Sequence, residues 1–426
     1  MTVSFYVGLI FFFALGYAFI IFEKLHNINK AATALLMAAG CWFIYFLSQI
    51  LAGHPPKFPS EQLADVASII FFLLAVMAIV ELIDSHHGFK LITDLLHTTS
   101  KRKMLWLVLV ISFFMSSVLD NLTSMIVMIS LLRKLISKKE DRWILGSLVV
   151  ITVNAGGAWT PIGDVTTTMM WINDRITTWN IIKALFLPSV VCTIVAGLFG
   201  MLLIKKSDQA LQNQPKPLPM EIGARRVFCG GVLALVLIPV WKSLFSIPPF
   251  MGALIGLAAL WLITDLIHFR EKDTRHHLQV PHILAKIDIS GVLFFLGILL
   301  AVSALTTAGI LKDFANLLEK MLPNQNYVAV FIGLLSSIVD NVPLVAATFG
   351  MYDLATYPTD SVLWQLIAYA AGTGGSILII GSAAGVAFMG IEHVDFFWYF
   401  KKISWVALLG YFAGIIVYFL QLSIIT

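Results

Sequence analysis

Charged residues are scarce in this sequence. Asp, Glu, Lys and Arg make up 12% of the 426 residues, about half the share that a soluble domain carries. Hydrophobic residues make up 59%, and apolar runs of about 20 residues, the length that crosses a bilayer as a helix, recur along the whole chain. The composition therefore excludes a soluble multi-domain protein and predicts an all-α polytopic membrane protein.

Cysteine and extended basic patches are also rare. Cys41, Cys192 and Cys229 lie in or beside apolar runs and form no CxxC pair, so we expect them to be packing residues. The net charge of +4 is small and the basic residues occur in short loops, which argues against nucleic acid as a partner. Motifs of hydrolases, metalloproteases and nucleotide-binding proteins are missing too. We therefore expect no enzyme, no catalytic residues and no cofactor.

Apolar segments that could cross or enter a membrane are found throughout the chain. The first one lacks a preceding basic region and is too long for a signal peptide, so we interpret it as the first span. The segments cover about residues 3–22, 31–52, 66–84, 104–136, 143–172, 181–204, 225–245, 250–268, 287–310, 327–350, 362–390 and 402–424.

Two polar motifs occur twice at nearly the same offset. Ser116-Ser117-Val118-Leu119-Asp120-Asn121 returns 220 residues later as Ser336-Ser337-Ile338-Val339-Asp340-Asn341. The Gly-rich stretch 154–164 corresponds to 372–382. Two motifs in one order predict two tandem halves. The first repeat is 1–210, with a hairpin at 104–136 and a broken helix at 143–172. The second is 211–426, with a hairpin at 327–350 and a broken helix at 362–390.

Loop charges predict how the two halves are oriented. If segments 104–136 and 327–350 each enter and leave on one side, 22 of the 28 Lys and Arg residues lie on one face of the membrane. If each segment crosses once, this bias disappears, so the positive-inside rule favours hairpins. Re-entrant hairpins and pairs of short full spans give the same count, and we prefer the re-entrant form because the arms are short.

This topology gives each half five transmembrane helices and one hairpin. Because five is odd, the second repeat is inverted relative to the first. Both termini then lie on the non-cytoplasmic side of the cell (inner) membrane. Amphipathic stretches at 88–96 and 309–318 precede the hairpins and predict helices at the membrane surface.

Three carboxylates, Asp120, Asp164 and Asp340, are predicted to lie at membrane depth. Each costs roughly 2.5–3.5 kcal/mol at the centre of a helix, and their motifs contain no Lys or Arg. A proton or a metal cation remains as the neutralising partner. The many oxygen donors nearby suit a hard alkali cation, whereas His and Cys ligands for softer metals are missing. N-capping of the second hairpin arm is a simpler role for Asp120 and Asp340, and it does not exclude ion binding.

The candidate residues follow from these motifs. We expect Na⁺ at Asp120 and Asp340. Glu81, near the cytoplasmic end of the third span, is either a proton-path carboxylate or part of an interfacial polar cluster. The full set of candidate cation- and proton-binding residues is Asp120, Asn121, Asp340, Asn341, Asp164, Asn154, Thr160, Ser117, Ser337, Thr373 and Ser376.

The motifs also resemble a known family. The stretch Gly156-Gly157-Ala158-Trp159-Thr160-Pro161-Ile162-Gly163-Asp164-Val165-Thr166-Thr167 and the paired Asp-Asn tips resemble the NhaD-type sodium/proton antiporters. These belong to a superfamily that also holds citrate, dicarboxylate and arsenite carriers. The resemblance covers nearly the whole chain. It implies a homodimer, a scaffold built from the early spans of each half, and a transport domain of hairpins and broken helices that moves like an elevator.

The hairpin tips distinguish between substrates of opposite charge. The related dicarboxylate carriers have Ser-Asn-Thr where this sequence has Asp-Asn, and an acid repels an anion. We therefore expect exchange of cytoplasmic Na⁺ (or Li⁺) for external H⁺. A Na⁺- or H⁺-coupled carrier of a dicarboxylate, citrate or arsenite is the alternative, and a membrane sensor or assembly partner that transports nothing is a second one. The position that mirrors Glu81, around Ser303 to Thr307, carries no acid.

Overall fold

The computed structural model describes residues 3–23, 28–55, 60–93, 100–204, 221, 223–269, 280–322 and 324–425. These residues form helices and connecting turns, with no β-strand among them, which confirms the predicted all-helical membrane protein. Eight of the helices described are long and apolar enough to cross a membrane. They are α1 (Val3–Ile21), α3 (Lys30–Leu51), α4 (Ser60–Ser85), α10 (Thr178–Leu203), α11 (Ala224–Phe245), α12 (Pro249–Ile267), α14 (Ile289–Thr307) and α21 (Ser404–Ile425).

The four segments that carry the polar motifs are each broken into two shorter helices. Segment 104–136 forms α6 (Lys101–Ser116) and α7 (Asn121–Leu135), and segment 143–172 forms α8 (Lys139–Ala158) and α9 (Val165–Ile172). Segment 327–350 forms α16 (Gln325–Leu335) and α17 (Asn341–Met351), and segment 362–390 forms α18 (Val362–Gly374) and α19 (Ala383–Glu392). Every break coincides with a predicted polar motif.

Four further helices are short. A helix at the second amphipathic stretch is confirmed by α15 (Ile310–Met321). At the first stretch only α5 (Lys90–Thr93) is described, and residues 94–96 of that prediction lie outside the described residues. The helices α13 (Val280–Leu284) and α20 (Phe396–Lys402) were not predicted. The helix α20 follows its N-cap Asp395, whose carboxylate accepts a hydrogen bond from the Trp398 N–H at 2.8 Å.

The three cysteines are free thiols. Cys41 and Cys192 are buried, as predicted for packing residues. Cys229 is exposed on α11, so the prediction of a packing role is wrong there. Its thiol lies on an apolar transmembrane helix, and the sequence pattern could not distinguish the side of such a helix that faces lipid from the side that faces protein.

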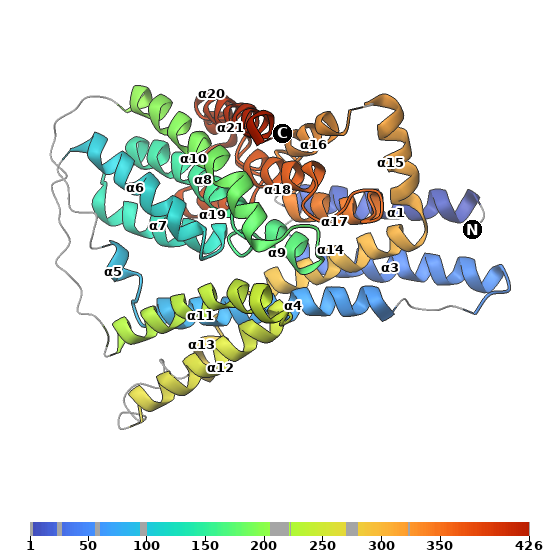
Figure 1. Ribbon diagram of the computed structural model, residues 1–426, viewed down its shortest axis with the longest axis horizontal. Coiled ribbons are helices and arrows are strands. Elements are labelled where there is room, and N and C mark those ends of the chain that lie inside the picture. Colours follow the sequence, from blue (N-terminus) through green and yellow to red (C-terminus); the bar gives the residue numbers. More distant parts are fainter. Residues whose placement is uncertain are drawn as a thin grey trace.

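The two halves of the chain interleave. Three helices of the first half pack against their counterparts in the second: α4 against α14, α8 against α18, and α10 against α21. In Figure 1, α6 to α10 lie together with α18 to α21, whereas α3, α4, α11 and α12 run along the lower side. The helix breaks of the two halves therefore lie close together, and helices from both halves surround them.

The contacts that hold each hairpin to its broken helix are the same in both halves. Ser116 Oγ donates to the Val153 carbonyl at 2.6 Å, and Ser336 Oγ donates to the Ala371 carbonyl at 2.8 Å. At Gly156 an added Cβ would collide with the backbone of the first hairpin, and at Gly374 with that of the second. Glycine is required at both positions because two backbones touch there.

Candidate cation site

Four helix N-termini carry polar caps at the breaks. Asp120 caps α7, Asp164 caps α9, Asp340 caps α17 and Ser382 caps α19. Each cap satisfies one of the N–H groups that a helix start leaves without a partner. Their side chains accept from the backbone N–H groups of Thr123 (2.8 Å), Thr166 (3.0 Å), Val342 (3.3 Å) and Gly385 (3.2 Å), respectively.

Asp164 is contacted by both hairpin tips. Its Oδ2 accepts hydrogen bonds from Asn121 Nδ2 at 3.1 Å and from Asn341 Nδ2 at 3.4 Å. The residue is 2% exposed. Among the described residues no Lys or Arg forms a salt bridge with it. A buried carboxylate without a cationic partner needs a proton or a cation to be stable.

Asn154 connects the two halves at the same place. Its Oδ1 accepts from Asn121 Nδ2 at 3.0 Å, and its Nδ2 donates to Ser376 Oγ and Ser382 Oγ, both at 2.9 Å. We refer to the connected residues as the central polar cluster. Its members are Asn121, Asn154, Asp164, Asn341, Ser376 and Ser382, all of them buried.

Asp120 and Asp340 lie beside this cluster without a hydrogen bond to it. Both are half-buried, and both interact electrostatically with Asp164. The Asp120 carboxylate accepts from both the N–H and the hydroxyl of Thr123, the latter at 2.7 Å. Pro343 stands at the equivalent position after Asp340 and offers neither group. The carboxylate of Asp340 therefore has more oxygen lone pairs open to a ligand.

Two residues near Asp340 were missed by the sequence analysis. Tyr17 on α1 and Lys30 at the start of α3 both interact electrostatically with this carboxylate. The Lys30 ammonium also lies over the Phe294 ring, 4.6 Å from its centroid. Nothing in the sequence places residues 17 and 30 beside residue 340, because the proximity arises from the packing of the first helices against the second half.

Four of the predicted hydroxyls lie outside the cluster and bond to backbone carbonyls. Since each donates to a nearby carbonyl, they close helix ends or fasten the hairpin tip. Their acceptors are Phe114 for Ser117 (2.7 Å), Leu334 for Ser337 (2.7 Å), Tyr369 for Thr373 (2.6 Å) and Ser117 for Thr160 (2.7 Å).

Glu81 lies in a separate polar group at the end of α4. Its Oε1 accepts from Ser85 Oγ at 3.1 Å, and Lys286 Nζ donates to the same Ser85 oxygen at 3.1 Å. At the opposite end of the α4–α14 contact, Ser303 and Thr307 donate to Gln62 Oε1. The mirrored position therefore carries hydroxyls and an amide in place of an acid. No hydrogen bond in the described part of the chain joins Glu81 to the central polar cluster.

A buried ion cluster at the base of the first hairpin was also missed. The Glu392 carboxylate, 1% exposed, accepts from Arg133 Nε at 2.6 Å and from Arg142 Nε at 3.1 Å. Arg133 also donates to the Ile391 carbonyl. These contacts fasten α7 and α8 to α19 of the other half. The signal in the sequence that could have indicated this cluster is Glu392, a single acid at the end of the apolar run 383–391.

The donor set favours a hard monovalent cation. In the part of the chain that is described, no group of three or more His, Cys, Asp or Glu residues could hold a metal ion. The cluster instead offers one carboxylate and the oxygens of amides and hydroxyls. Such oxygen donors suit alkali cations and disfavour soft transition metals.

Comparison with known proteins agrees with this geometry. The chain matches the citrate transporter family (CitMHS) over residues 17–374. It is 52% identical over 415 residues to sodium/proton antiporter 1 of Arabidopsis thaliana, covering 97% of this chain and 72% of that protein. Sodium/proton antiporter 2 of the same plant is 49% identical, over 95% and 97% of the two chains. The Na⁺/H⁺ antiporter NhaD of Vibrio cholerae is 27% identical, over 96% and 90%. The chain therefore belongs to the citrate transporter (CitMHS) family and, within it, groups with the NhaD-type sodium/proton antiporters.

Proposed function

We propose that this protein exchanges Na⁺ (or Li⁺) for H⁺ across a membrane. The observation that carries the proposal is the buried Asp164 carboxylate. Both hairpin tips donate hydrogen bonds to it, and no Lys or Arg in the described part of the chain forms a salt bridge with it. Relatives that match nearly the whole chain are named sodium/proton antiporters. Transport, with Na⁺ and H⁺ as substrates and no cofactor, is the chemistry we assign to the cluster.

The charge balance of the breaks supports a cationic substrate. A helix N-terminus carries about +0.5 charge and a C-terminus about −0.5. Each break joins the C-terminus of one helix to the N-terminus of the next, so these half-charges largely cancel. Lys30 offsets part of the charge of Asp340, but Asp120, Asp164 and Asp340 together leave the region with a net negative charge that attracts cations. An anion carrier would need the opposite sign at this place, so we do not favour the dicarboxylate, citrate or arsenite alternative.

Na⁺ and H⁺ compete for one site, and this competition couples the transport of one to the transport of the other. The sequence alone suggests Na⁺ at Asp120 and Asp340, but the hydrogen bonds of both hairpin tips converge on Asp164, and we therefore propose Asp164 as the central ligand. With Asp164 ionised, Na⁺ binds its free lone pairs together with amide and hydroxyl oxygens of the cluster. Asp120 and Asp340 both lie within electrostatic range of Asp164. Their negative charges strengthen the attraction for the cation, and they hold the second cation or proton. A proton displaces Na⁺ at the other face. Because an ionised, empty site is costly to move through an apolar barrier, only a loaded site crosses.

The architecture we propose is a pair of inverted repeats, 1–210 and 211–426. Packing of α4, α8 and α10 against their counterparts supports it, since a two-fold axis brings equivalent helices together. In Figure 1 the first hairpin and the second extend from opposite ends of the molecule towards its middle. We further propose re-entrant hairpins, an elevator-like motion of the hairpins and broken helices, a homodimer, and a location in the cell membrane with both termini on the non-cytoplasmic side.

The test is ΔpH dissipation in everted membrane vesicles. We expect wild-type protein to dissipate the gradient on addition of Na⁺ or Li⁺, and Asp164→Asn to lose this activity at normal expression. Asp353→Asn, which alters an exposed acid in the loop after α17, is the matched control and should behave as wild type. Full activity of Asp164→Asn would contradict the assignment of Asp164 as the central cation-binding residue. Uptake of labelled citrate or succinate without any cation-driven ΔpH change would instead support an anion carrier.

A further inference from the structure

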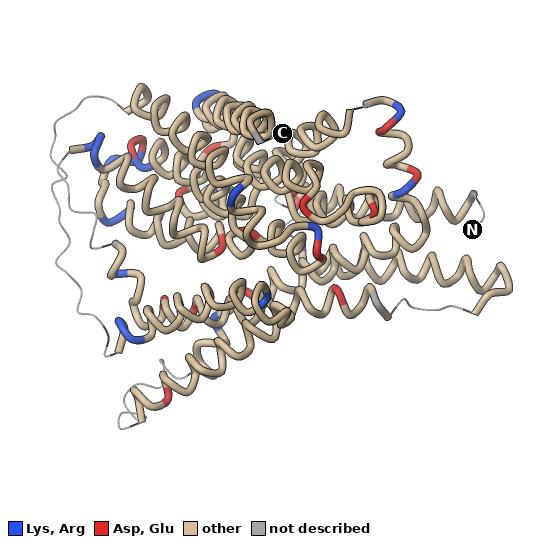
Figure 2. The backbone as a smooth tube through the Cα atoms, in the orientation of Figure 1, with Lys and Arg blue, Asp and Glu red and all other residues tan. Residues whose placement is uncertain are grey.

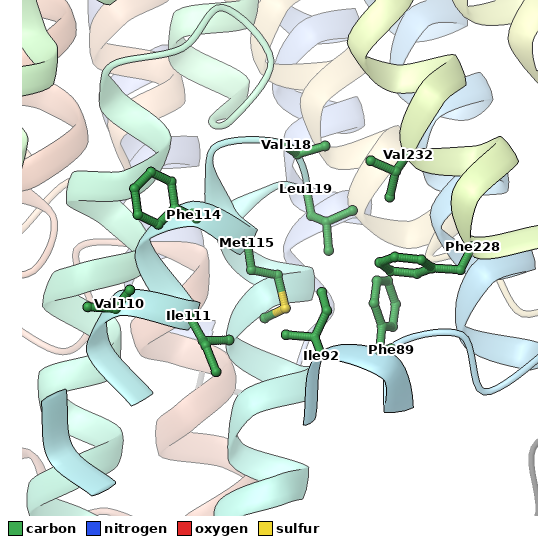
Figure 3. Close-up of a pocket in the computed structure, with 10 residues that line it drawn as sticks. All are labelled: Phe89, Ile92, Val110, Ile111, Phe114, Met115, Val118, Leu119, Phe228 and Val232. Atoms are coloured by element: carbon green, nitrogen blue, oxygen red, sulfur yellow. The ribbon is translucent and has the colours of Figure 1, made fainter. Parts of the chain in front are cut away.

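An apolar cavity of about 250 Å³ lies between the first hairpin and α11. Figure 3 shows α6 on one side, with Ile111 and Met115, and α11 opposite, with Phe228 and Val232. The short helix α5 closes the cavity from below in that view. All ten lining side chains are apolar. Val110 and Phe114, which also line it, are 49% and 52% exposed, so the cavity opens to the surroundings of the helices.

The two helices that line the cavity begin with exposed basic residues. α6 starts with Lys101, which pairs with Asp141 at 2.8 Å, followed by Arg102 and Lys103, both exposed. α11 starts at Ala224 and carries Arg225 and Arg226 in its first turn, both exposed. Figure 2 shows basic segments at the starts of both helices, at the same end of the molecule but apart from each other, with α5 between them in Figure 1. The basic residues of α11 lie nearer to the cavity along their helix, because Phe228, three residues after Arg225, lines it.

The spacing along the helices fits a phospholipid. Arg225 precedes the lining residues Phe228 and Val232 by three and seven positions, so all three lie on one face of α11. At 1.5 Å per residue these spacings are about 5 and 10 Å. A headgroup phosphate at the start of α11 would thus lie about 5–10 Å from the apolar lining of the cavity. Positive charge at the surface and a purely apolar cavity below it match the two parts of an anionic lipid.

We propose that this cavity binds an acyl chain of an anionic glycerophospholipid, with its headgroup held by Arg225 and Arg226 at the start of α11. The site is separate from the central polar cluster. It borders the hairpin tip, however, since Val118 and Leu119 line the cavity and directly precede Asp120. A bound chain fills space that the tip would otherwise be free to enter, so the lipid sets how the first hairpin packs against α11.

The test is lipid titration of the intact, purified protein, followed by native mass spectrometry. The probes are palmitoyl-oleoyl phosphatidylglycerol and phosphatidylcholine with the same chains. We expect the wild type to retain phosphatidylglycerol preferentially. Arg225→Gln/Arg226→Gln removes both of these charges and should weaken phosphatidylglycerol binding by on the order of tenfold or more. Val232→Trp fills the cavity and should reduce binding of that lipid with the basic residues intact.

Lys401→Gln/Lys402→Gln is the matched control. These two exposed lysines end α20, which contributes no residue to the cavity, and their loss removes the same charge. The control should bind phosphatidylglycerol as the wild type does. Equal retention of both lipids by the wild type, or equal losses in the control and in Arg225→Gln/Arg226→Gln, would overturn the proposal. Wild-type binding by Val232→Trp, with an unchanged elution profile, would overturn the placement of the chain.

Discussion

Asn121 and Asn341, 220 residues apart in the chain, direct their side-chain amides at the same oxygen of Asp164. The two tips are equivalent in the repeat, but the carboxylate that they share belongs to the first half alone. Ser382 occupies the equivalent position in the second half and bonds to Asn154 instead. Matching caps and hydrogen bonds in the two halves therefore surround a cluster with one central acid.

The two asparagines should differ in importance. Asn121→Ala removes hydrogen bonds to both Asp164 and Asn154, whereas Asn341→Ala removes one, at 3.4 Å. A hydrogen bond to a charged group contributes about 1.5–3 kcal/mol. We expect Asn121→Ala to raise the half-saturating Na⁺ concentration on the order of tenfold or more, and Asn341→Ala to raise it less. Asn324→Ala, at the exposed cap of α16, should leave it unchanged. The reverse order of effects would contradict the geometry.

Proton competition gives a second expectation. If Na⁺ binds the ionised form of the central acid, each unit of acidification in the range where protons compete should raise the half-saturating Na⁺ concentration up to about tenfold. The maximal rate at saturating Na⁺ should change less. The measurement is Na⁺ titration of proteoliposomes at a series of pH values. A half-saturating concentration that does not vary with pH would show separate sites for Na⁺ and H⁺.

Thr123 distinguishes the first hairpin from the second. Its N–H and hydroxyl both bond to Asp120, and Thr123→Ala removes the hydroxyl only. We expect a loss of about 1 kcal/mol of stability, the usual contribution of one hydrogen bond. Thermal unfolding of Thr123→Ala and of the wild type in detergent measures this loss, and equal unfolding midpoints would mean that the hydroxyl of Thr123 contributes nothing through Asp120.

Much of this arrangement could be predicted from the sequence. Apolar runs fix the helices to within a few residues, and the repeated Ser-Ser-x-x-Asp-Asn motif fixes the breaks, because polar residues and glycines disfavour a continuous apolar helix. The identity of the cluster was only partly predictable. Asn154 pairs with Ser376 and Ser382 through the interleaving of the halves, which no local pattern encodes. Lys30 lies near Asp340 for the same reason.

Gly156 tests whether the backbone contact at the break is required. An added methyl group would collide with the carbonyl of Phe113, which cannot move without shifting the hairpin. We expect Gly156→Ala to cost about 1–3 kcal/mol, the range typical of overpacking, and to lower transport through the displaced tip. Gly390→Ala is the control, since nothing lies within 4 Å of its added Cβ. Measurements are the unfolding midpoint and ΔpH dissipation. Wild-type behaviour of Gly156→Ala would contradict the close approach.

Glu392 should matter for stability rather than for ion binding. Glu392→Gln keeps the shape but leaves Arg133 and Arg142 without their carboxylate. Breaking a buried pair costs about 3–5 kcal/mol, and because the Arg133 side chain is 49% exposed we expect a smaller loss, about 2 kcal/mol. Glu140→Gln, an exposed acid in the first turn of α8, should have little effect.

The readouts that separate these roles for Glu392 are the unfolding midpoint and the half-saturating Na⁺ concentration. A lowered midpoint with unchanged Na⁺ dependence is expected, because the ion cluster lies at the base of the hairpin and the proposed cation site at its tip. A changed Na⁺ dependence at full stability would instead mean that the fastening of α7 to α19 controls the site. Arg142→Gln should then reproduce the same change, since its guanidinium bonds to the same carboxylate.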